Sequence, residues 1–368
     1  MVRELSMISL FEVFVKDTYK GKRRKHTQER IKPQTAKTYE SMLHVLKDYE
    51  IYYGKKVMIR INVKGDRRSQ ISEMRYWENF YRKFSLFMYQ KRGCFDNYVG
   101  HFFKVIKCFF RYLKEQKLFQ VSDFYKRFYA RQDKIRIISL SPERLFFLIT
   151  DKEFQQKLTI YENRYREYLV FGSIAALRYS DLMNLKVRDV EQLRINNEEL
   201  KMENGYFLYY RSLKTDTPVR IKLPEFAAEI FKKYSKGKKP LDKIFTGISI
   251  GNFNKHLQKI AFKAQWTEPI GRIRHHEGEE TELRIKNEKL RTKSNTGGIY
   301  RFCDMMGSHV MRRTGITILL MLGMPELLVR KISGHSAHSK EFYRYVDFAQ
   351  SFITEEIEKA YKRLMETR

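Results

Sequence analysis

The chain has 368 residues, which is enough for one large domain or for two to three smaller ones. Hydrophobic residues make up 42% of it and charged residues 32%, so we expect a soluble protein with substantial cores. No apolar run reaches the ~18 residues of a membrane span, and the first residues mix acids into a short apolar run, unlike a secretory signal. The three cysteines lie far apart, which excludes a disulfide framework or a zinc motif and favours a reduced, cytoplasmic protein.

The excess of basic residues is the strongest signal in the composition. Lys and Arg number 73 against 43 Asp and Glu, a formal net charge of +30, and both the first 136 residues and the remainder are basic. A charge of this size favours a polyanionic partner, so we expect a DNA or RNA surface that extends over the whole protein. The alternative is charge that serves only solubility, a purpose that acidic residues would fulfil equally well.

The N-terminal part is predicted to be helical and basic. Residues 1–32 combine a short apolar helix, at 7–15, with a dense basic run at 20–32. That run lacks apolar periodicity and is interpreted as a mobile arm or loop lying on phosphates, although a solvated linker has the same composition.

Residues 33–130 are predicted to form a small, basic, all-helical domain. Apolar residues at i, i+3 and i+4 spacing indicate helices at 35–54, 71–93 and 97–119, with a short strand or loop at 56–65. The aromatic residues follow the helical period, which favours a buried core over a platform for stacking bases.

A second domain is predicted over residues 137–350. Periodicity lapses around 124–145, where Ser141 followed by Pro142 offers a helix start. Further on, β-rich segments separated by turn residues predict a three-stranded antiparallel sheet at 187–193, 205–214 and 218–224. Other expected elements are a buried helix within 161–185 followed by a short helix capped by Ser180, helices at 224–234 and 251–266, a β-hairpin or mobile loop at 271–290, and a capped amphipathic helix at 351–368. The expected fold class is therefore mainly α, a helical domain followed by an α+β domain.

Two basic residues stand where predicted elements end. Arg178 follows an apolar helix, so the base of its side chain is buried and it needs a partner or a function. Asp181, three residues on, could orient it, and an internal Arg–Asp pair is the simpler explanation. Lys214 lies at the tip of a predicted hairpin, from which it could donate a proton to a leaving oxygen in a cleft, although such lysines are commonly only surface charges.

The stretch 307–348 gathers further candidates. His309 and Arg312 share one face of a predicted helix, and His335 follows a glycine that ends the next helix. A tail with Tyr343 and Tyr345 comes directly after. Arginine and histidine hold phosphodiesters, and tyrosine is a nucleophile that can accept a phosphoryl group, whereas the nearby carboxylates lack the spacing of a metal site.

These residues and their neighbours resemble the motifs of the tyrosine recombinases, the phage-integrase family. The motifs occur in the family's order: 176–182 for the first Arg box, 213–215 with 219–224 for the Lys box, 309–314 for the His-x-x-Arg box, 333–336 for the Gly-His, and 342–345 for the nucleophile segment. The helical N-terminal half is similar to the family's core-binding domain. The arrangement most resembles integrases of Bacteroidetes mobile elements.

The resemblance implies a function in DNA recombination. It implies strand cleavage and rejoining through a 3′-phosphotyrosyl intermediate, without a cofactor, metal or ATP, by a catalytic set of Arg178, Lys214, His309, Arg312, His335 and Tyr345. The family places its tyrosine nine residues after the Gly-His histidine, a position held here by Arg344 between Tyr343 and Tyr345. A one-residue insertion near 337–341 would make Tyr345 the nucleophile, which the Phe-x-Arg-Tyr context favours, with Tyr343 as the alternative.

The resemblance also implies partners. They are double-stranded DNA and further copies of the chain in a homotetramer on two DNA sites, with room for accessory DNA-bending proteins. The C-terminal helix would be exchanged between protomers or packed within its own. Two other functions are considered: a type IB topoisomerase, which relaxes supercoils without a defined site, and a non-catalytic DNA-binding accessory protein, against which the complete residue set argues.

Overall fold

A computed structural model describes residues 3–25, 27–61, 66–133, 136–193, 205–284, 298–336 and 339–366. The chain divides into two compact units: unit 1 consists of Met1–Ile135 and Ile273–Leu283, and unit 2 of Arg136–Arg272 and Arg284–Arg368. Each unit has a hydrophobic core of its own. Within the described residues, no helix combines the length and the apolar character that crossing a membrane requires.

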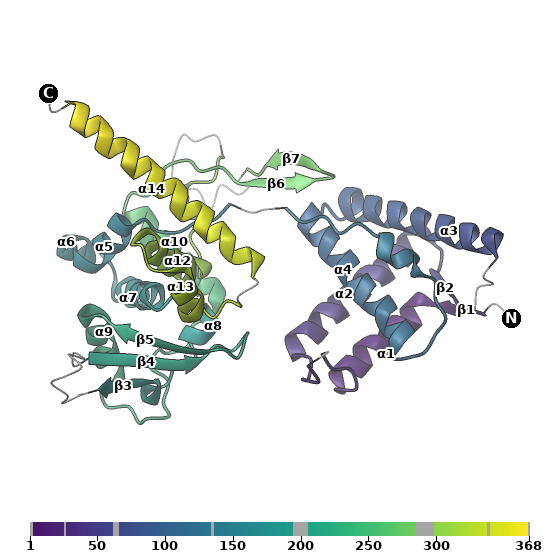
Figure 1. Cartoon of the computed structure of the whole chain (residues 1–368), viewed down its shortest axis with the longest axis horizontal. Helices are drawn as coiled ribbons and strands as arrows, with labels where there is room; N and C mark the ends of the chain where they lie inside the picture. The colour runs from purple at the N-terminus through teal and green to yellow at the C-terminus, as the bar shows by residue number, and fades with distance from the viewer. Residues whose placement is uncertain are drawn as a thin grey trace. The chain divides into compact units, whose positions relative to one another are not determined.

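Unit 1 is mainly helical, with two short strand pairs (Figure 1). Its elements are β1 (Arg3–Ser6), α1 (Met7–Tyr19), α2 (Pro33–Tyr53), β2 (Met58–Ile61), α3 (Arg67–Leu86), η1 (Phe87–Lys91), α4 (Asp96–Glu115), η2 (Asp123–Arg127), β6 (Ile273–His276) and β7 (Glu279–Glu282). The helices begin where the sequence supplies a start. Ser6 and Asp66 accept backbone N–H groups as caps of α1 and α3, and Pro33 opens α2.

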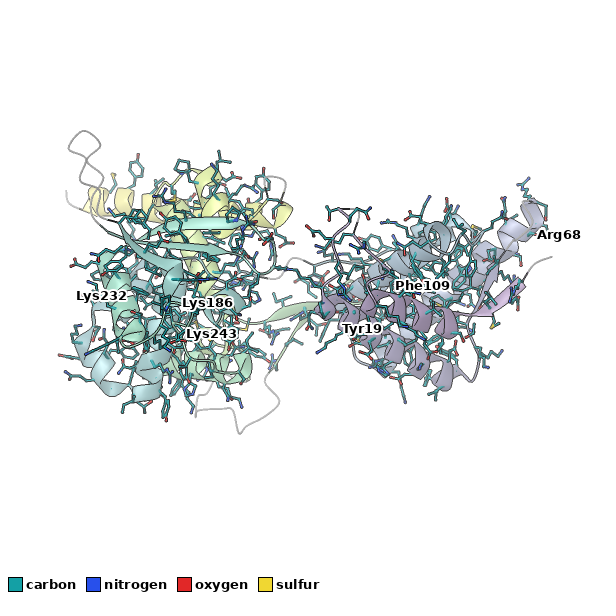
Figure 2. All side chains as sticks on the ribbon, turned by 90° about the horizontal axis from the view of Figure 1, so that it is seen from below. Tyr19, Arg68, Phe109, Lys186, Lys232 and Lys243 are labelled. Carbon is teal, nitrogen blue, oxygen red and sulfur yellow. The ribbon has the colours of Figure 1, made fainter. Side chains whose placement is uncertain are left out.

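The core of unit 1 is built from aromatic rings. Phe109 of α4 contacts Phe11 and Phe14 of α1, with ring centroids 4.8 and 5.5 Å apart, and Trp77 of α3 stacks on Phe124 at 4.3 Å. Phe109 lies among the helices in Figure 2, whereas the exposed Arg68 stands at the tip of α3. The predicted core role of the aromatic stripe is therefore confirmed.

One prediction for unit 1 needs correction. The domain is not all-helical, because β1 pairs antiparallel with β2 in the segment that the sequence left open between strand and loop. The basic run at 20–32, predicted as a mobile arm or loop, is a folded loop in the residues that the structure describes. The N–H groups of Lys22 and Arg23 donate to Asp17 O (3.0 and 3.3 Å), and Arg24 forms a β-bridge with Arg30.

Strands β6 and β7 form a hairpin that belongs to unit 1 although its sequence lies far downstream. At its turn, Gly278 N–H donates to the buried Asp96 Oδ2 (2.9 Å), which also accepts from Arg131 Nη1 (3.3 Å). The ring of His276 lies 5.1 Å from that of Tyr89. A β-hairpin or mobile loop was predicted for this stretch, and a hairpin is present.

Unit 2 consists of a group of helices with a small antiparallel sheet along one edge (Figure 1). Its elements are α5 (Pro142–Thr150), α6 (Lys152–Lys157), α7 (Ile160–Ile174), α8 (Tyr179–Leu182), η3 (Val187–Asp189), β3 (Val190–Leu193), β4 (Gly205–Arg211), β5 (Pro218–Leu223), α9 (Glu225–Ser235), α10 (Ile250–Lys263), α11 (Phe302–Met305), α12 (His309–Met321), α13 (Glu326–Ser333) and α14 (Lys340–Glu366). The sheet order is β3-β4-β5, so the predicted three-stranded antiparallel sheet is confirmed.

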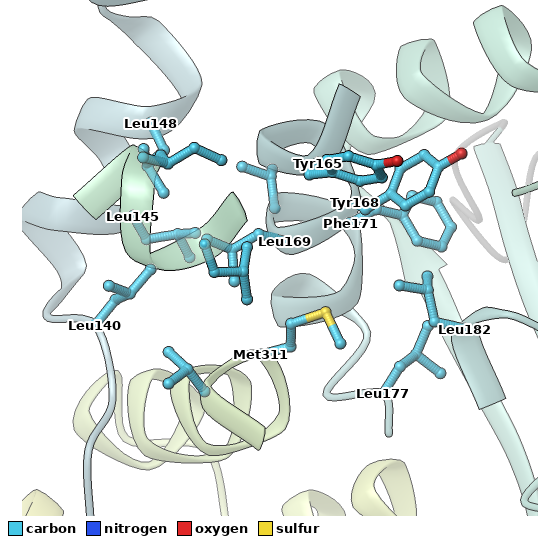
Figure 3. Packing of buried hydrophobic residues seen from close by; sticks show 14 of the residues in the cluster. Leu140, Leu145, Leu148, Tyr165, Tyr168, Leu169, Phe171, Leu177, Leu182 and Met311 are labelled. Atoms are coloured by element: carbon cyan, nitrogen blue, oxygen red, sulfur yellow. The ribbon is translucent and has the colours of Figure 1, made fainter. Parts of the chain in front are cut away.

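Helix α7 lies at the centre of unit 2. Its residues Tyr168, Leu169 and Phe171 are fully buried, and Met311 of α12 packs beneath them (Figure 3). Buried leucines near and on α5 close another side of the cluster. A core of this kind fixes the C-terminal end of α7, from which the first candidate residue projects.

Two predictions for unit 2 are wrong in detail. Helix α8 begins at Tyr179 with Arg178 at its N-cap, so Ser180 does not cap it. The tail helix predicted at 351–368 is not separate, because α14 runs without interruption from Lys340 to Glu366 and contains both candidate tyrosines. Its sequence holds no Gly or Pro that would end a helix after the tyrosines.

Candidate active site

Arg178 is positioned by the way in which α7 ends. Leu177 N–H donates to Gly172 O (2.8 Å) and Ala176 N–H donates to Ser173 O (3.1 Å), the pair of bonds that defines a Schellman helix end. The closure requires a left-handed residue, and Ala176 fills this position with φ of +47°. The chain then leaves the helix axis, and Arg178 follows two residues later at the start of α8.

Ser212 and Asp181 hold the side chain of Arg178. Arg178 Nη1 donates to Ser212 Oγ (2.8 Å) and lies 3.8 Å from Asp181 Oδ2. Ser212 Oγ in turn donates to Asp181 Oδ2 (3.3 Å), and both of these residues are buried. The Arg–Asp pair considered from the sequence therefore exists, and a serine at the end of β4 mediates it.

The turn that carries Lys214 is anchored on both sides. Leu213 N–H donates to Asp181 Oδ1 (3.0 Å), and Thr215 Oγ1 donates to Gly334 O (3.4 Å). Lys214 stands between these anchors, and its side chain is exposed. The backbone around Lys214 is thus tied to the segments that carry Arg178 and His335.

Two glycines let α12 approach α7 closely. A Cβ added to Gly315 would lie 2.1 Å from Ser173 O, and one added to Gly172 would lie 2.5 Å from Met311 Sδ. A larger residue at Gly315 would force the two helices apart, because it would meet a backbone oxygen, whereas one at Gly172 would have to displace the Met311 side chain. This close approach brings Arg312, on the face of α12 that meets α7, to the last carbonyl groups of α7.

Arg312 joins the ends of two helices. Its Nη1 donates to Ala176 O (3.1 Å) at the end of α7, and its Nη2 donates to Ser333 O at the end of α13. The residue is only 4% exposed, and in the described part of the chain no carboxylate forms an ion pair with it. Carbonyl groups at helix C-termini carry partial negative charge, which compensates the buried guanidinium. Burial, together with the charge of Arg178, lowers the pKa of Arg312 to about 10, so it stays charged at neutral pH.

His335 is placed by a second Schellman helix end. Its N–H donates to Arg330 O (3.0 Å), and the left-handed residue is Gly334, with φ of +61°. Arg312 Nη2 lies 3.3 Å from the His335 ring nitrogens, and Ser333 Oγ lies 2.8 Å from Nδ1. Burial and the neighbouring arginines lower the pKa of His335 to about 3, so its imidazole is neutral above pH 4.

His309 opens α12 on the exposed side of the same cluster. Desolvation lowers its pKa, and the charges of Arg313, Lys214, Arg312 and Arg178 lower it further. A pKa depressed by four cations indicates a strongly positive potential, which only an anion would relieve.

The two candidate tyrosines lie on different faces of α14. The Tyr345 ring is 5.9 Å from that of His335, and Tyr345 packs on a small cluster with Phe342 and Val329. Tyr343 is 51% exposed, and its ring lies 5.0 Å from the guanidinium carbon of Arg330. Arg344, between them, forms an ion pair with Glu341 (3.0 Å). Of the two phenols, that of Tyr345 therefore adjoins the cationic cluster.

The structure gathers the six predicted residues in one region of unit 2. Arg178, Arg312 and His335 form its interior, Tyr345 lies beside His335, and the exposed Lys214 and His309 influence it through their charges. Among the described residues, no group of three or more His, Cys, Asp or Glu side chains is placed to hold a metal ion.

Some residues of the site escaped the sequence reasoning. Ser212 and Ser333 supply the hydroxyl groups that contact Arg178 and His335. Tyr210 of β4 also lies here, where burial and the Asp181 carboxylate raise the pKa of its phenol. Serines next to motif residues are too common in sequences to be singled out, and only the register of β4 shows that Tyr210 faces inward.

Comparison of the sequence with family models and with curated proteins finds no match. Solved structures are similar. The Tn1549 transposon integrase bound to a circular intermediate DNA has a TM-score of 0.57 at 14% identity, over 94% of each chain. A lambda integrase dimer bound to a core site has a TM-score of 0.53 at 12% identity, over 93% of this chain and 95% of that one. A lambda integrase tetramer on a Holliday junction has a TM-score of 0.52 at 11% identity, over 91% and 79%.

These similarities bear on the fold, because the shared identity is low. They agree with the predicted class, a helical domain followed by a mixed domain with a small antiparallel sheet. The narrower resemblance to integrases of Bacteroidetes mobile elements stays a prediction. The chain therefore shares its fold with the Tn1549 transposon integrase and with lambda integrase.

Proposed function

We propose that the protein is a site-specific DNA recombinase, an integrase that cuts and rejoins strands through a 3′-phosphotyrosyl intermediate. The observation that carries this proposal is the meeting of Arg178, Arg312 and His335 beside the phenol of Tyr345. A buried cationic cluster next to a single nucleophile suits a phosphodiester better than any neutral substrate.

The two arginines provide the electrostatic part of the reaction. Arg178 and Arg312 would donate to the non-bridging oxygens of the scissile phosphate and stabilise the charge of the five-coordinate transition state. Both are held by neighbours that do not neutralise them fully: Arg178 by Ser212 with Asp181 behind it, Arg312 by helix-end carbonyls. They are thus oriented before the substrate arrives, so little reorganisation opposes the reaction.

The covalent step exchanges one phosphoester bond for another. The Tyr345 oxygen attacks phosphorus and loses its proton, the bond from phosphorus to the 5′-oxygen breaks, and Lys214 gives that oxygen a proton. His309 and His335 would hydrogen-bond the phosphate, and His309 also accepts the phenolic proton. Because the phosphotyrosine link conserves the energy of the broken phosphoester bond, religation to another strand needs no ATP.

Phosphate binding should change the protonation of His335. Its depressed pKa arises from burial and from the charges of Arg312 and the other cations around it. A phosphate between those cations would offset their field and raise the pKa of His335, so that the ring can donate from both nitrogens.

Unit 1 offers a basic hollow for the DNA backbone. The folded loop after α1 and one face of α4 enclose about 460 Å³. Lining cations are Lys22, Arg23, Arg24, Lys25 and Arg111, against a single acid, Glu115. Arg23 is 6% exposed and lies 3.9 Å over the ring of Phe14. Such a concentration of like charge favours phosphate contacts, which position DNA without reading its sequence.

That hollow can be tested separately from catalysis. Replacing Lys22, Arg24 and Arg111 by Ala should lower the slope of log affinity against log salt by about two to three, whereas replacing exposed Lys37, Lys55 and Lys56 should change it less. Equal changes in both sets would mean that the charge acts diffusely.

The end of α14 supports the proposed assembly. Ile357, Tyr361 and Met365 recur every four residues and are 50%, 65% and 71% exposed, an apolar stripe on one helix face. We place this stripe against a second protomer in a homotetramer on two DNA sites, as a tetramer is known for the similar lambda integrase. The division into a basic arm, a core-binding domain, a catalytic domain and an exchanged helix, the cytoplasmic location and the use of accessory DNA-bending proteins belong to the same proposal.

The decisive experiment traps the covalent intermediate. The unchanged protein and two variants, Tyr345→Phe and Tyr343→Phe, are each incubated with nicked suicide DNA. This DNA carries the end sequence of the proposed mobile element. Adduct should form with the unchanged protein and with Tyr343→Phe but not with Tyr345→Phe. Adduct from Tyr345→Phe alone would overturn the choice of nucleophile, and DNA binding without any adduct would favour an accessory protein. Relaxation of supercoils without a defined site would favour a topoisomerase.

A further inference from the structure

Arg330 is a buried cation close to the site that the proposed chemistry does not use. It lies on α13 and is 4% exposed. Its Nε donates to Glu326 Oε1 (2.7 Å), one helical turn earlier, which offsets its charge and fixes the start of its side chain. Burial of an arginine is costly unless its other donors also find partners, so the remaining contacts of its guanidinium are informative.

Those contacts go to the segment between α13 and α14. Arg330 Nη1 donates to Ser336 O (3.0 Å) and lies 3.5 Å from Ser339 O. The guanidinium carbon is 4.2 Å from the Phe342 ring centroid and 5.0 Å from that of Tyr343. One side chain thus contacts two carbonyls of the connection and two rings of the first turn of α14.

The first turn of α14 decides which phenol faces the cationic cluster. Successive residues on a helix point about 100° apart, so a shift of one residue would turn Tyr345 away from His335, and a shift of two would bring Tyr343 to its place. Phe342 and Tyr345 now share the inward face, where Phe342 is fully buried. Tyr345 lies ten residues after His335 and Tyr343 eight, so the register of α14 decides which of the two phenols lies beside His335.

We propose that Arg330 is a positioning residue that sets the register of α14 and thereby selects Tyr345 over Tyr343 as the nucleophile. The proposal rests on the function proposed above and deepens it. Arg330 does not touch the reacting phosphate: it acts through the Ser336 and Ser339 carbonyls and the Phe342 ring. Its chemistry suits the task, since a planar fork can bind two carbonyls and stack on a ring at the same time.

The test asks where the DNA becomes attached. The full chain is compared with Arg330→Met and Arg330→Lys on the same suicide DNA, and the modified peptide is identified by mass spectrometry. Arg166→Met is the matched control. Arg166 is also a buried arginine of unit 2, at 7% exposure, and its Nη1 donates to a backbone carbonyl, Leu148 O (2.5 Å), away from α14. It therefore reports the effect of losing a buried arginine as such.

We expect Arg330→Met to bind DNA as the unchanged chain does, to cleave at least 10-fold more slowly than Arg166→Met, and to attach a measurable share of DNA through Tyr343. Arg330→Lys keeps the ion pair with Glu326 but lacks the fork, so it should restore rate and attachment site only in part. If Arg330→Met does not fold, Arg330→Lys alone carries the comparison.

Two outcomes separate this proposal from the one on which it rests. Adduct exclusively at Tyr345 in both Arg330 variants, at the rate of the Arg166→Met control, would overturn the positioning role and leave the recombinase function intact. No adduct with the unchanged chain, despite DNA binding, would overturn the proposed function itself and the positioning role with it.

Discussion

Helices α7 and α13 end in the same way and serve the same purpose with different residues. Both close with a Schellman pair of hydrogen bonds, and both deliver a candidate residue directly afterwards, Arg178 after α7 and His335 after α13. The left-handed position is Ala176 in the first and Gly334 in the second. Since a left-handed alanine costs about 1 kcal/mol more than glycine, the difference needs a reason.

The reason lies in what surrounds each position. Ala176 is fully buried, and its methyl group fills the space above Gly315 of α12. At Gly334 an added Cβ would meet only the side chains of polar residues, the nearest being Thr215 Oγ1 at 3.5 Å, so a methyl group would fit but would gain no tight apolar packing. At the end of α7, packing of the alanine methyl group offsets the backbone cost. At the end of α13, the left-handed backbone alone favours glycine.

Arg312 couples the two ends, because it donates to a carbonyl at each of them. The candidate site is therefore the meeting point of two helix C-termini, joined by a guanidinium. Four changes test this comparison, and they are ordered by the size of the expected effect.

Replacing Arg312, which connects the two helix ends, should have the largest effect on cleavage and stability. Arg312→Leu leaves the carbonyls of Ala176 and Ser333 without their donor and takes one cation from the phosphate site. We expect adduct formation to fall by on the order of 10²–10³-fold and the free energy of unfolding to fall by about 3 kcal/mol. Suicide-substrate cleavage and urea unfolding measure the two effects. Unchanged stability with lost cleavage would mean that the helix ends hold together without Arg312.

Separating α12 from α7 should come next. Gly315→Ala puts a Cβ 2.1 Å from Ser173 O, a backbone atom that cannot move without shifting the end of α7. We expect a loss of about 2–3 kcal/mol in urea unfolding and slower cleavage. Gly251→Ala is the control, since that helical glycine has open space around it and should be neutral or slightly stabilising. Equal effects of the two changes would contradict the close-approach argument.

Acid should weaken the α13 end through His335. Its pKa is lowered to about 3 in the folded protein, whereas an unfolded histidine titrates near 6.5. Below pH 6.5 the unfolded state therefore binds more protons, and stability falls as the pH drops from 6.5 toward 3. Between pH 7.5 and pH 5 we expect a loss of about 1–2 kcal/mol that His335→Gln removes, measured by urea unfolding at both values. An identical pH dependence in the variant would show that the ring is not the responsible group.

Exchanging the left-handed residues should have the smallest effect. Gly334→Ala should cost about 1 kcal/mol through its backbone. Ala176→Gly relieves a similar backbone cost but loses a buried methyl group, so its net change should stay within about 0.5 kcal/mol. Gly93→Ala, at φ of +60° in open space, gives the backbone cost alone. A large loss in Ala176→Gly would show that the methyl packing dominates.

Much of this arrangement could be predicted from local sequence rules. Gly334 indicated the end of α13, the Ser141-Pro142 pair indicated the start of α5, and alternating residues indicated the three-stranded sheet. Each of these rests on near neighbours in the chain, where propensity and capping suffice. The preference for Tyr345 over Tyr343 also rested on local sequence, the Phe-x-Arg-Tyr context, and it stays a prediction.

The remaining features depend on long-range contacts. Nothing in the residues around Arg312 shows that its partners are carbonyl groups 136 and 21 residues away. Ala176 gave no sign of a helix end, since the usual signal is glycine or asparagine. The joining of α14 into one helix was missed because the segment from Ser351 was predicted as a separate capped helix, whereas Ser351 lies within α14 and its Oγ donates to Asp347 O (2.9 Å).

The hairpin of β6 and β7 bears on any attempt to study unit 1 in isolation. A fragment ending near residue 133 would lack Gly278, and the Asp96 carboxylate, 1% exposed, would lose one of its two donors. Such a truncation would yield a product that is less stable than the same residues are within the whole chain. To isolate unit 1 intact, residues 273–283 would have to be supplied together with the N-terminal segment, because the unit is built from two separate parts of the chain.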